Sequence, residues 1–127
     1  MSAASILWVA AGGALGSVAR YWLAAFVAGL TGPFFPWGTL LINVLGSFVI
    51  GWFGAWTGPD GPIDVPPDIR VFVLVGICGG FTTFSSFSLQ TLELLNAGET
   101  LRAGSYILGS VALCLLAVWA GFVLGRT

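Results

Sequence analysis

Hydroxyl side chains gather in one short stretch of an otherwise apolar segment. From Gly79 to Ser88 the sequence reads GGFTTFSSFS, in which five hydroxyl groups are interleaved with phenylalanines. Two adjacent glycines weaken a helix. Irregular, hydroxyl-rich backbone at membrane depth is tolerated only where it is buried in protein or lines a cavity. The stretch therefore predicts a place where something polar binds or moves in the middle of a bilayer.

Phenylalanines recur at every third position of the same stretch, at Phe81, Phe84 and Phe87. Core packing is the usual interpretation of such a stripe. An aromatic ring, however, has a positive edge and a negative face. Ring edges beside hydroxyl donors can hold an anion without a full positive charge. The donors lie on neighbouring faces of the segment, at Thr82, Thr83, Ser85, Ser86 and Ser88.

Two other apolar segments carry polar residues at helical spacing. Asn43 follows Thr39 by four residues and precedes Ser47 by four, so the three share one helix face. An amide in hydrocarbon is costly unless it is paired, which leaves two interpretations open: a hydrogen bond between helices, or a donor stripe that faces a pore. Tyr106 and Ser110 are also four apart and can face one interior, although Tyr106 equally suits an interfacial aromatic belt.

The composition restricts the class of protein. Of the 127 residues, 57% are hydrophobic and 7% are charged, whereas about a quarter of a soluble domain is charged. We therefore expect an integral membrane protein, and the net charge of −1 offers no basic patch for nucleic acid. The absence of histidine removes imidazole metal sites and histidine base catalysis. Cys78 and Cys114 form no CxxC motif and are expected to be buried apolar residues. No enzyme activity is predicted.

Four segments are each long enough to span a bilayer, which takes about 20 apolar residues. They cover residues 3–29, 37–56, 69–95 and 103–124. The fold class predicted is an all-α membrane protein with four transmembrane helices in a single domain, 1–127. Its third helix is expected to be broken near Gly79–Thr83. The N-terminus has no charged n-region and its apolar run continues past Ala28, so we expect a retained span rather than a signal peptide.

The charges near the span ends do not choose an orientation. With four spans, Arg70 and Arg126 lie on one side, Arg20 and Arg102 lie on the other, and there is no lysine. The positive-inside rule counts these residues, and the two sides carry two each. Either another determinant sets the orientation, or the chain inserts both ways and pairs with an inverted copy. Small-residue pairs of the GxxxG type favour a tightly packed oligomer. They are Gly12/Gly16, Gly76/Gly80 and Gly121/Gly125.

Together these residues resemble the CrcB-type fluoride channels, the Fluc family, over essentially the whole chain. The residues that carry the resemblance run from Gly12 to Tyr21, from Trp37 to Gly46 and from Gly76 to Phe87. The last of these motifs is the specific one. The resemblance implies an antiparallel, dual-topology homodimer in the cell membrane with two pores, through which toxic fluoride leaves passively. The partners implied are fluoride, a second copy of the chain and the lipid bilayer.

The resemblance also implies roles for single residues. Phe84 and Phe87 are the pore phenylalanines, Asn43 is the pore amide and Ser110 is the hydroxyl of the fourth helix. Thr83 and Ser86 continue the polar track, and Thr39 and Tyr106 are added to the predicted pore residues because of their helical spacing. Arg20 belongs to the vestibule, into which it could attract anions.

A structural Na⁺ at the dimer dyad is implied as well, held by the backbone carbonyls of Gly79 and Thr82 from both subunits. No organic cofactor is expected. Many relatives carry a glutamate where this chain has Gln90, so no role of that carboxylate transfers. The alternative function is a small, dual-topology, proton-coupled exporter of cations or drugs. That mechanism needs a carboxylate within the membrane, for which Glu93, near a span end, is the only candidate.

Overall fold

The computed structural model describes residues 1–127 as a bundle of helices joined by short connections. Three spans are single α-helices: α1 (Ala3–Thr31), α2 (Trp37–Trp56) and α6 (Thr100–Gly125). The third span, Pro67–Asn96, consists of four helical pieces: α3 (Pro67–Val71), the π-helical η1 (Phe72–Ile77), α4 (Cys78–Phe81) and α5 (Phe84–Asn96). The prediction of an all-α membrane protein is confirmed. Every element is helical, and the four spans are long and apolar enough to cross a membrane.

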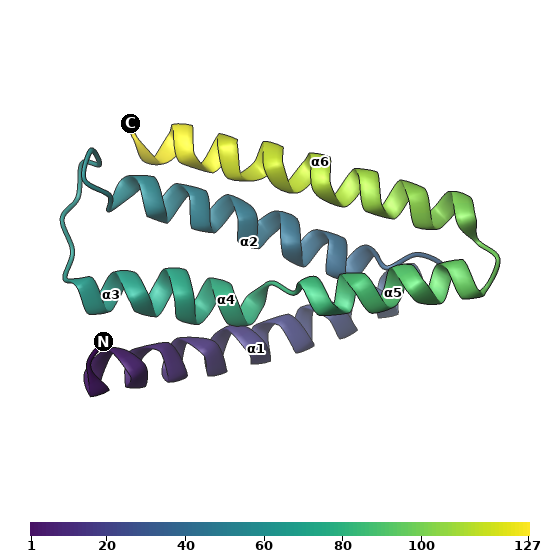
Figure 1. Ribbon diagram of the computed structural model, residues 1–127, viewed down its shortest axis with the longest axis horizontal. Helices are drawn as coiled ribbons and strands as arrows, with labels where there is room; N and C mark the ends of the chain where they lie inside the picture. The colour runs from purple at the N-terminus through teal and green to yellow at the C-terminus, as the bar shows by residue number, and fades with distance from the viewer.

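The spans form two packed pairs within one bundle. α2 packs along α6, and α1 packs along η1 and α4. Both chain termini lie at one end of the bundle, together with the connection between α2 and α3 (Figure 1). The turn between α5 and α6 lies at the opposite end. This arrangement places the middle of α2 beside the junction of α4 and α5.

Glycines allow the helices of each pair to approach closely. A Cβ atom on Gly12 of α1 would lie 2.9 Å from the Cα of Gly76 in η1. A Cβ atom on Gly121 of α6 would lie 2.9 Å from the backbone nitrogen of Trp52 in α2. The GxxxG pairs were expected to pack one copy against another, but they pack helices within this chain, where small residues let backbones meet.

A glycine also sets the turn that returns the chain from α5 to α6. Gly98 has φ 79°, a left-handed conformation that costs little without a Cβ atom. The Glu99 N–H donates to the Leu94 carbonyl at 2.9 Å, and the Gly98 N–H donates to the Leu95 carbonyl at 3.0 Å. These two bonds make a Schellman motif, which ends α5 and brings α6 back against it.

Most of the apolar surface faces outward. Only 18 of the 127 residues are buried. In α2, 39% of the apolar stretch is buried, against 11% in each of the other three spans. Lipid or another protein chain must cover so large an apolar surface. The central helix of the protomer is therefore α2, which carries Asn43.

Candidate functional site

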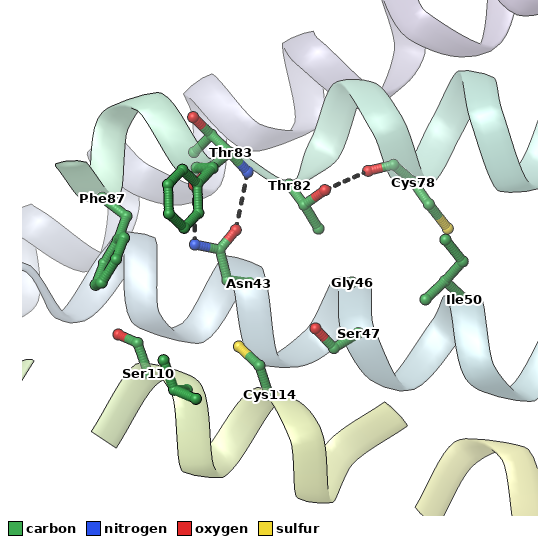
Figure 2. A pocket seen from close by; sticks show the side chains of 12 residues that line it. Asn43, Gly46, Ser47, Ile50, Cys78, Thr82, Thr83, Phe87, Ser110 and Cys114 are labelled. Atoms are coloured by element: carbon green, nitrogen blue, oxygen red, sulfur yellow. Dashed lines mark hydrogen bonds between the residues drawn. The ribbon is translucent and has the colours of Figure 1, made fainter. Parts of the chain in front are cut away.

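Asn43 pairs with the backbone where α4 and α5 meet. Two residues connect these helices, and both are extended: Thr82 at φ −88°, ψ 158° and Thr83 at φ −152°, ψ 119°. The Asn43 Nδ2 group donates to the Thr83 carbonyl at 3.0 Å, and the Thr83 N–H donates to Asn43 Oδ1 at 2.9 Å (Figure 2). The amide thus satisfies both backbone groups of an extended residue that has no helical partner for them.

Side chains also bind the backbone on either side of Thr83. The Thr83 hydroxyl accepts the Ser86 N–H at 3.1 Å and so caps the start of α5. The Thr82 hydroxyl donates to the Cys78 carbonyl at 2.8 Å. From α1, Arg20 Nε donates to the Gly80 carbonyl at 3.0 Å. A positive guanidinium at the C-terminal end of a helical segment offsets the partial negative charge of its carbonyls.

An inner pocket of about 290 Å³ lies between α2, α6 and the junction of α4 with α5. Its polar lining comes from Asn43, Ser47, Thr82, Thr83 and Ser110. The rest of the lining is Gly46, Ile50, Cys78, Phe84, Phe87, Val111 and Cys114 (Figure 2). None of the lining residues is charged. The pocket therefore offers neutral hydrogen-bonding groups and aromatic rings inside an apolar bundle.

Ser110 carries the one buried side-chain polar atom that has no partner in the protomer. The residue is 6% exposed, and its hydroxyl oxygen makes no hydrogen bond. Its side chain extends from α6 toward the pocket (Figure 2). A buried hydroxyl without a partner costs about 1–3 kcal/mol, so this group is expected to bind something that enters the pocket.

The two phenylalanines of the pocket differ in their surroundings. The rings of Phe84 and Phe87 are 5.5 Å apart between centroids. Phe84 is 78% exposed, whereas Phe87 is partly buried and packs on the Tyr106 ring at 4.9 Å. The protomer thus supports the ring of Phe87 and leaves the ring of Phe84 open to a neighbour.

A second, larger cavity of about 460 Å³ opens at the end of the bundle that holds the turn between α5 and α6. Thr39 and Gln90 line it, together with the charged Glu93, Glu99 and Arg102. This end cavity therefore contains ionisable groups of both signs, unlike the inner pocket.

Tyr106 lies in the protein interior rather than in an aromatic belt. It is 0% exposed, and its hydroxyl donates to Gln90 Oε1 at 2.8 Å. Sequence reasoning had left both locations open for this residue. The burial follows from the position of Tyr106 on the face of α6 that packs against α2 and α5.

The structure brings some of the predicted site residues together and separates others. Asn43, Thr82, Thr83, Phe84, Phe87 and Ser110 all line the inner pocket. Other predicted residues lie outside its lining: Arg20, Thr39, Gly79, Ser86 and Tyr106.

Three groups near the site were not assigned to it from the sequence. Cys114 lines the pocket one helical turn beyond Ser110, and Gln90 lies three residues beyond Phe87. The spacing of four or three residues from a predicted site residue was a signal for both. Cys78, on α4, also lines the pocket, four residues before the predicted site residue Thr82.

Comparison with known proteins gives a consistent family. The sequence profile described as "CrcB-like protein, Camphor Resistance (CrcB)" matches residues 7–122. A protein of Methylocella silvestris named "Fluoride-specific ion channel FluC" is 60% identical over 92% of this chain and 89% of its own length. Proteins with the same name are 58% identical in Rhodospirillum rubrum, over 92% of this chain and 91% of the relative, and 48% identical in Rhizobium meliloti, over 95% of each.

Proposed function

Since this chain belongs to the CrcB family, we propose that it is a fluoride-selective channel through which toxic fluoride leaves the cell passively. The chain is a multi-pass protein of the cell membrane with four spanning helices. The observation that carries the proposal is the inner pocket, where an unpartnered buried hydroxyl faces an uncharged lining that includes two phenylalanines.

The chemistry of the pocket suits fluoride. Fluoride is small and strongly hydrated, so a protein must replace its water with closely placed hydrogen-bond donors. The Ser110 hydroxyl and the second N–H of the Asn43 amide are available donors, since each amide group carries two. Ring edges of Phe84 and Phe87 add weak positive potential. A site without full positive charge binds the ion weakly enough for it to leave, as conduction requires.

The other polar residues of the predicted pore extend from this pocket toward both neighbouring regions of the bundle. Thr83 and Ser86 continue the track at the start of α5, where their groups are already joined by a hydrogen bond. Thr39 lines the end cavity, with Tyr106 buried beside it. Arg20 is assigned to the vestibule, where the guanidinium nitrogens that do not bind Gly80 can attract anions.

We further propose an antiparallel, dual-topology homodimer with two pores. Phe84 is 78% exposed at the rim of the inner pocket, which is difficult to reconcile with a pore complete in one copy. The even division of arginines between the two sides allows both orientations. A second, inverted copy would cover the exposed ring of Phe84 and enclose the pocket.

A structural Na⁺ at the dyad fits the carbonyls that this chain offers. Among the carbonyls of residues 78–83, side chains bind those of Cys78, Gly80 and Thr83, and no side chain binds those of Gly79, Phe81 and Thr82. Backbone carbonyls freed where a helix is interrupted suit a hard cation such as Na⁺. Gly79 and Thr82 of both subunits would hold the ion, whose charge would join the subunits and raise the potential nearby.

Anion efflux from liposomes tests the function. The purified protein is reconstituted, and the release of fluoride and of chloride is followed with ion-selective electrodes. We expect rapid loss of fluoride with chloride retained. A verified dimer that releases no fluoride would refute the proposal, and proton-coupled cation uptake by the same liposomes would identify the exporter instead.

A further inference from the structure

We propose that Gln90 and Tyr106 are positioning residues that fix the ring of Phe87 in the wall of the inner pocket. Neither residue lines that pocket. They act on it through a chain of contacts from α5 to α6 and back to α5. The inference rests on the proposed function, because its readout is fluoride conduction.

Contacts on three sides hold the Tyr106 ring. Its hydroxyl donates to Gln90 Oε1 at 2.8 Å. The ring packs on Phe87 at 4.9 Å between centroids and 57° between planes, and on Phe35 at 5.4 Å and 80°. A fully buried ring with three such neighbours has little freedom to turn. The bond to Gln90 is the direct hydrogen bond of the hydroxyl end of the side chain, with the Thr39 side chain as a further polar neighbour.

The hydrogen bond links back to the helix that carries Phe87. Gln90 follows Phe87 by three residues on α5, so both side chains point to the same side of that helix. Tyr106 thus contacts α5 at two consecutive turns, through its hydroxyl at Gln90 and through its ring at Phe87. Phe84 has no contact of this kind and is 78% exposed. We call the hydrogen-bonded pair of Gln90 and Tyr106, with its contact to Phe87, the bracket. Within one protomer, the bracket orients only the ring of Phe87.

The bracket also separates the two cavities. Phe35 and Gln90 line the end cavity, and Phe87 lines the inner pocket. Tyr106 touches residues of both linings and belongs to neither. A shift of its ring would therefore change the position of Phe87 and the wall between the cavities at once.

The amide of Gln90 suits this task because it accepts a hydrogen bond without a negative charge. Leucine at position 90 has a similar size and no acceptor. Glutamate at position 90 keeps an acceptor oxygen at the same distance from the backbone. Phenylalanine at position 106 keeps the ring and removes only the hydroxyl. These substitutions isolate the hydrogen bond from the packing.

The experiment compares initial rates of fluoride efflux from liposomes with equal amounts of folded dimer, verified by size-exclusion chromatography. Gln90→Leu and Tyr106→Phe should each lower the rate about three- to tenfold, the factor that corresponds to one net hydrogen bond. The double variant should be no slower than the slower single variant, because both changes remove the same bond. Gln90→Glu should retain more of the rate than Gln90→Leu. Tyr21→Phe, at a site that is 79% exposed and makes no side-chain hydrogen bond, is the matched control.

A second background distinguishes positioning from general damage. In a Phe87→Ile protein, the added Gln90→Leu change should have no further effect, because the ring that it orients is absent. A further fall there, or single variants whose effects multiply in the double variant, would overturn the inference. Normal rates in both single variants, with a wild-type protein that releases fluoride selectively, would overturn it and leave the proposed function intact. A wild-type protein without fluoride release would refute both. If Gln90→Leu fails to fold, Tyr106→Phe alone decides.

Discussion

Replacing Asn43 with aspartate changes one atom of the contact between α2 and the junction of α4 with α5. The carboxylate keeps an oxygen that can accept the Thr83 N–H. Its other oxygen takes the place of Nδ2, which donates to the Thr83 carbonyl at 3.0 Å. Two acceptors then face each other, because an ionised carboxylate has no proton to donate. The change also adds a negative charge to a pocket whose lining has none.

The size of the expected effect of Asn43→Asp on fluoride efflux follows from the hydrogen bond that is lost. One net hydrogen bond contributes about 0.5–1.5 kcal/mol, and a buried carbonyl left without a donor costs about 1–3 kcal/mol. Because the carbonyl loses its donor while the Thr83 N–H keeps its acceptor, the extended geometry of Thr83 should lose about 1–3 kcal/mol relative to competing arrangements. Since about 1.4 kcal/mol corresponds to a tenfold change in rate, we expect fluoride efflux to fall about fivefold or more. Repulsion between the new charge and the anion acts in the same direction.

The assay measures fluoride efflux per folded dimer and, separately, the thermal stability of the same preparation. Asn96→Asp is the matched control, because it makes the same chemical change at an exposed position at the end of α5. We expect Asn43→Asp to lower both quantities and Asn96→Asp to change neither appreciably. Normal efflux with reduced stability would assign the amide to structure alone. Normal efflux and normal stability together would refute the reasoning about the Thr83 contact.

Three further predictions concern the pocket and the helix packing. Phe84→Ile and Phe87→Ile should each reduce fluoride efflux sharply in a dimer that still assembles, since they remove ring edges and keep apolar volume; unchanged rates in both would rule out a role for the rings. Ser110→Ala should slow efflux several-fold without loss of thermal stability, because the hydroxyl has no partner in the protomer; a clear drop in melting temperature would show a structural bond instead. Gly121→Leu should destabilise the fold by about 1–3 kcal/mol or more through overpacking, measured by thermal unfolding. Gly109→Leu, on the same helix with open space around its Cα, should not.

The Asn43 and Phe87 variants test different parts of the same pocket. Asn43 acts on the backbone of the junction, whereas Phe87 contributes a ring to the wall. The bracket of Gln90 and Tyr106 touches Phe87 and not Asn43, so its variants belong with those of Phe87. A loss of conduction in one set with the other intact would therefore show which part of the pocket limits the passage of fluoride.

Composition and apolar runs were enough to assign the class of the protein and its spans. Runs of about 20 apolar residues and a shortage of charge leave a chain no stable place except a bilayer, and that requirement is local. The GGFTTFSSFS stretch was recognisable for the same reason, because hydroxyl groups beside two glycines are unnecessary for spanning lipid. Gly98 ends a helix through a similarly local property, its own backbone preference.

The way in which the helices face one another could be learned only from their packing in three dimensions. Asn43 and Thr83 are 40 residues apart, and their pairing depends on the rotation of α2 against the junction of α4 and α5. The same rotation buries Tyr106 against Gln90, leaves the Ser110 hydroxyl without a partner, and places the GxxxG glycines within the chain rather than between copies. Helical periodicity fixes which residues share a face, but it does not say which helix that face meets. The packing of backbones at close range, set by glycine positions on several helices at once, makes that choice.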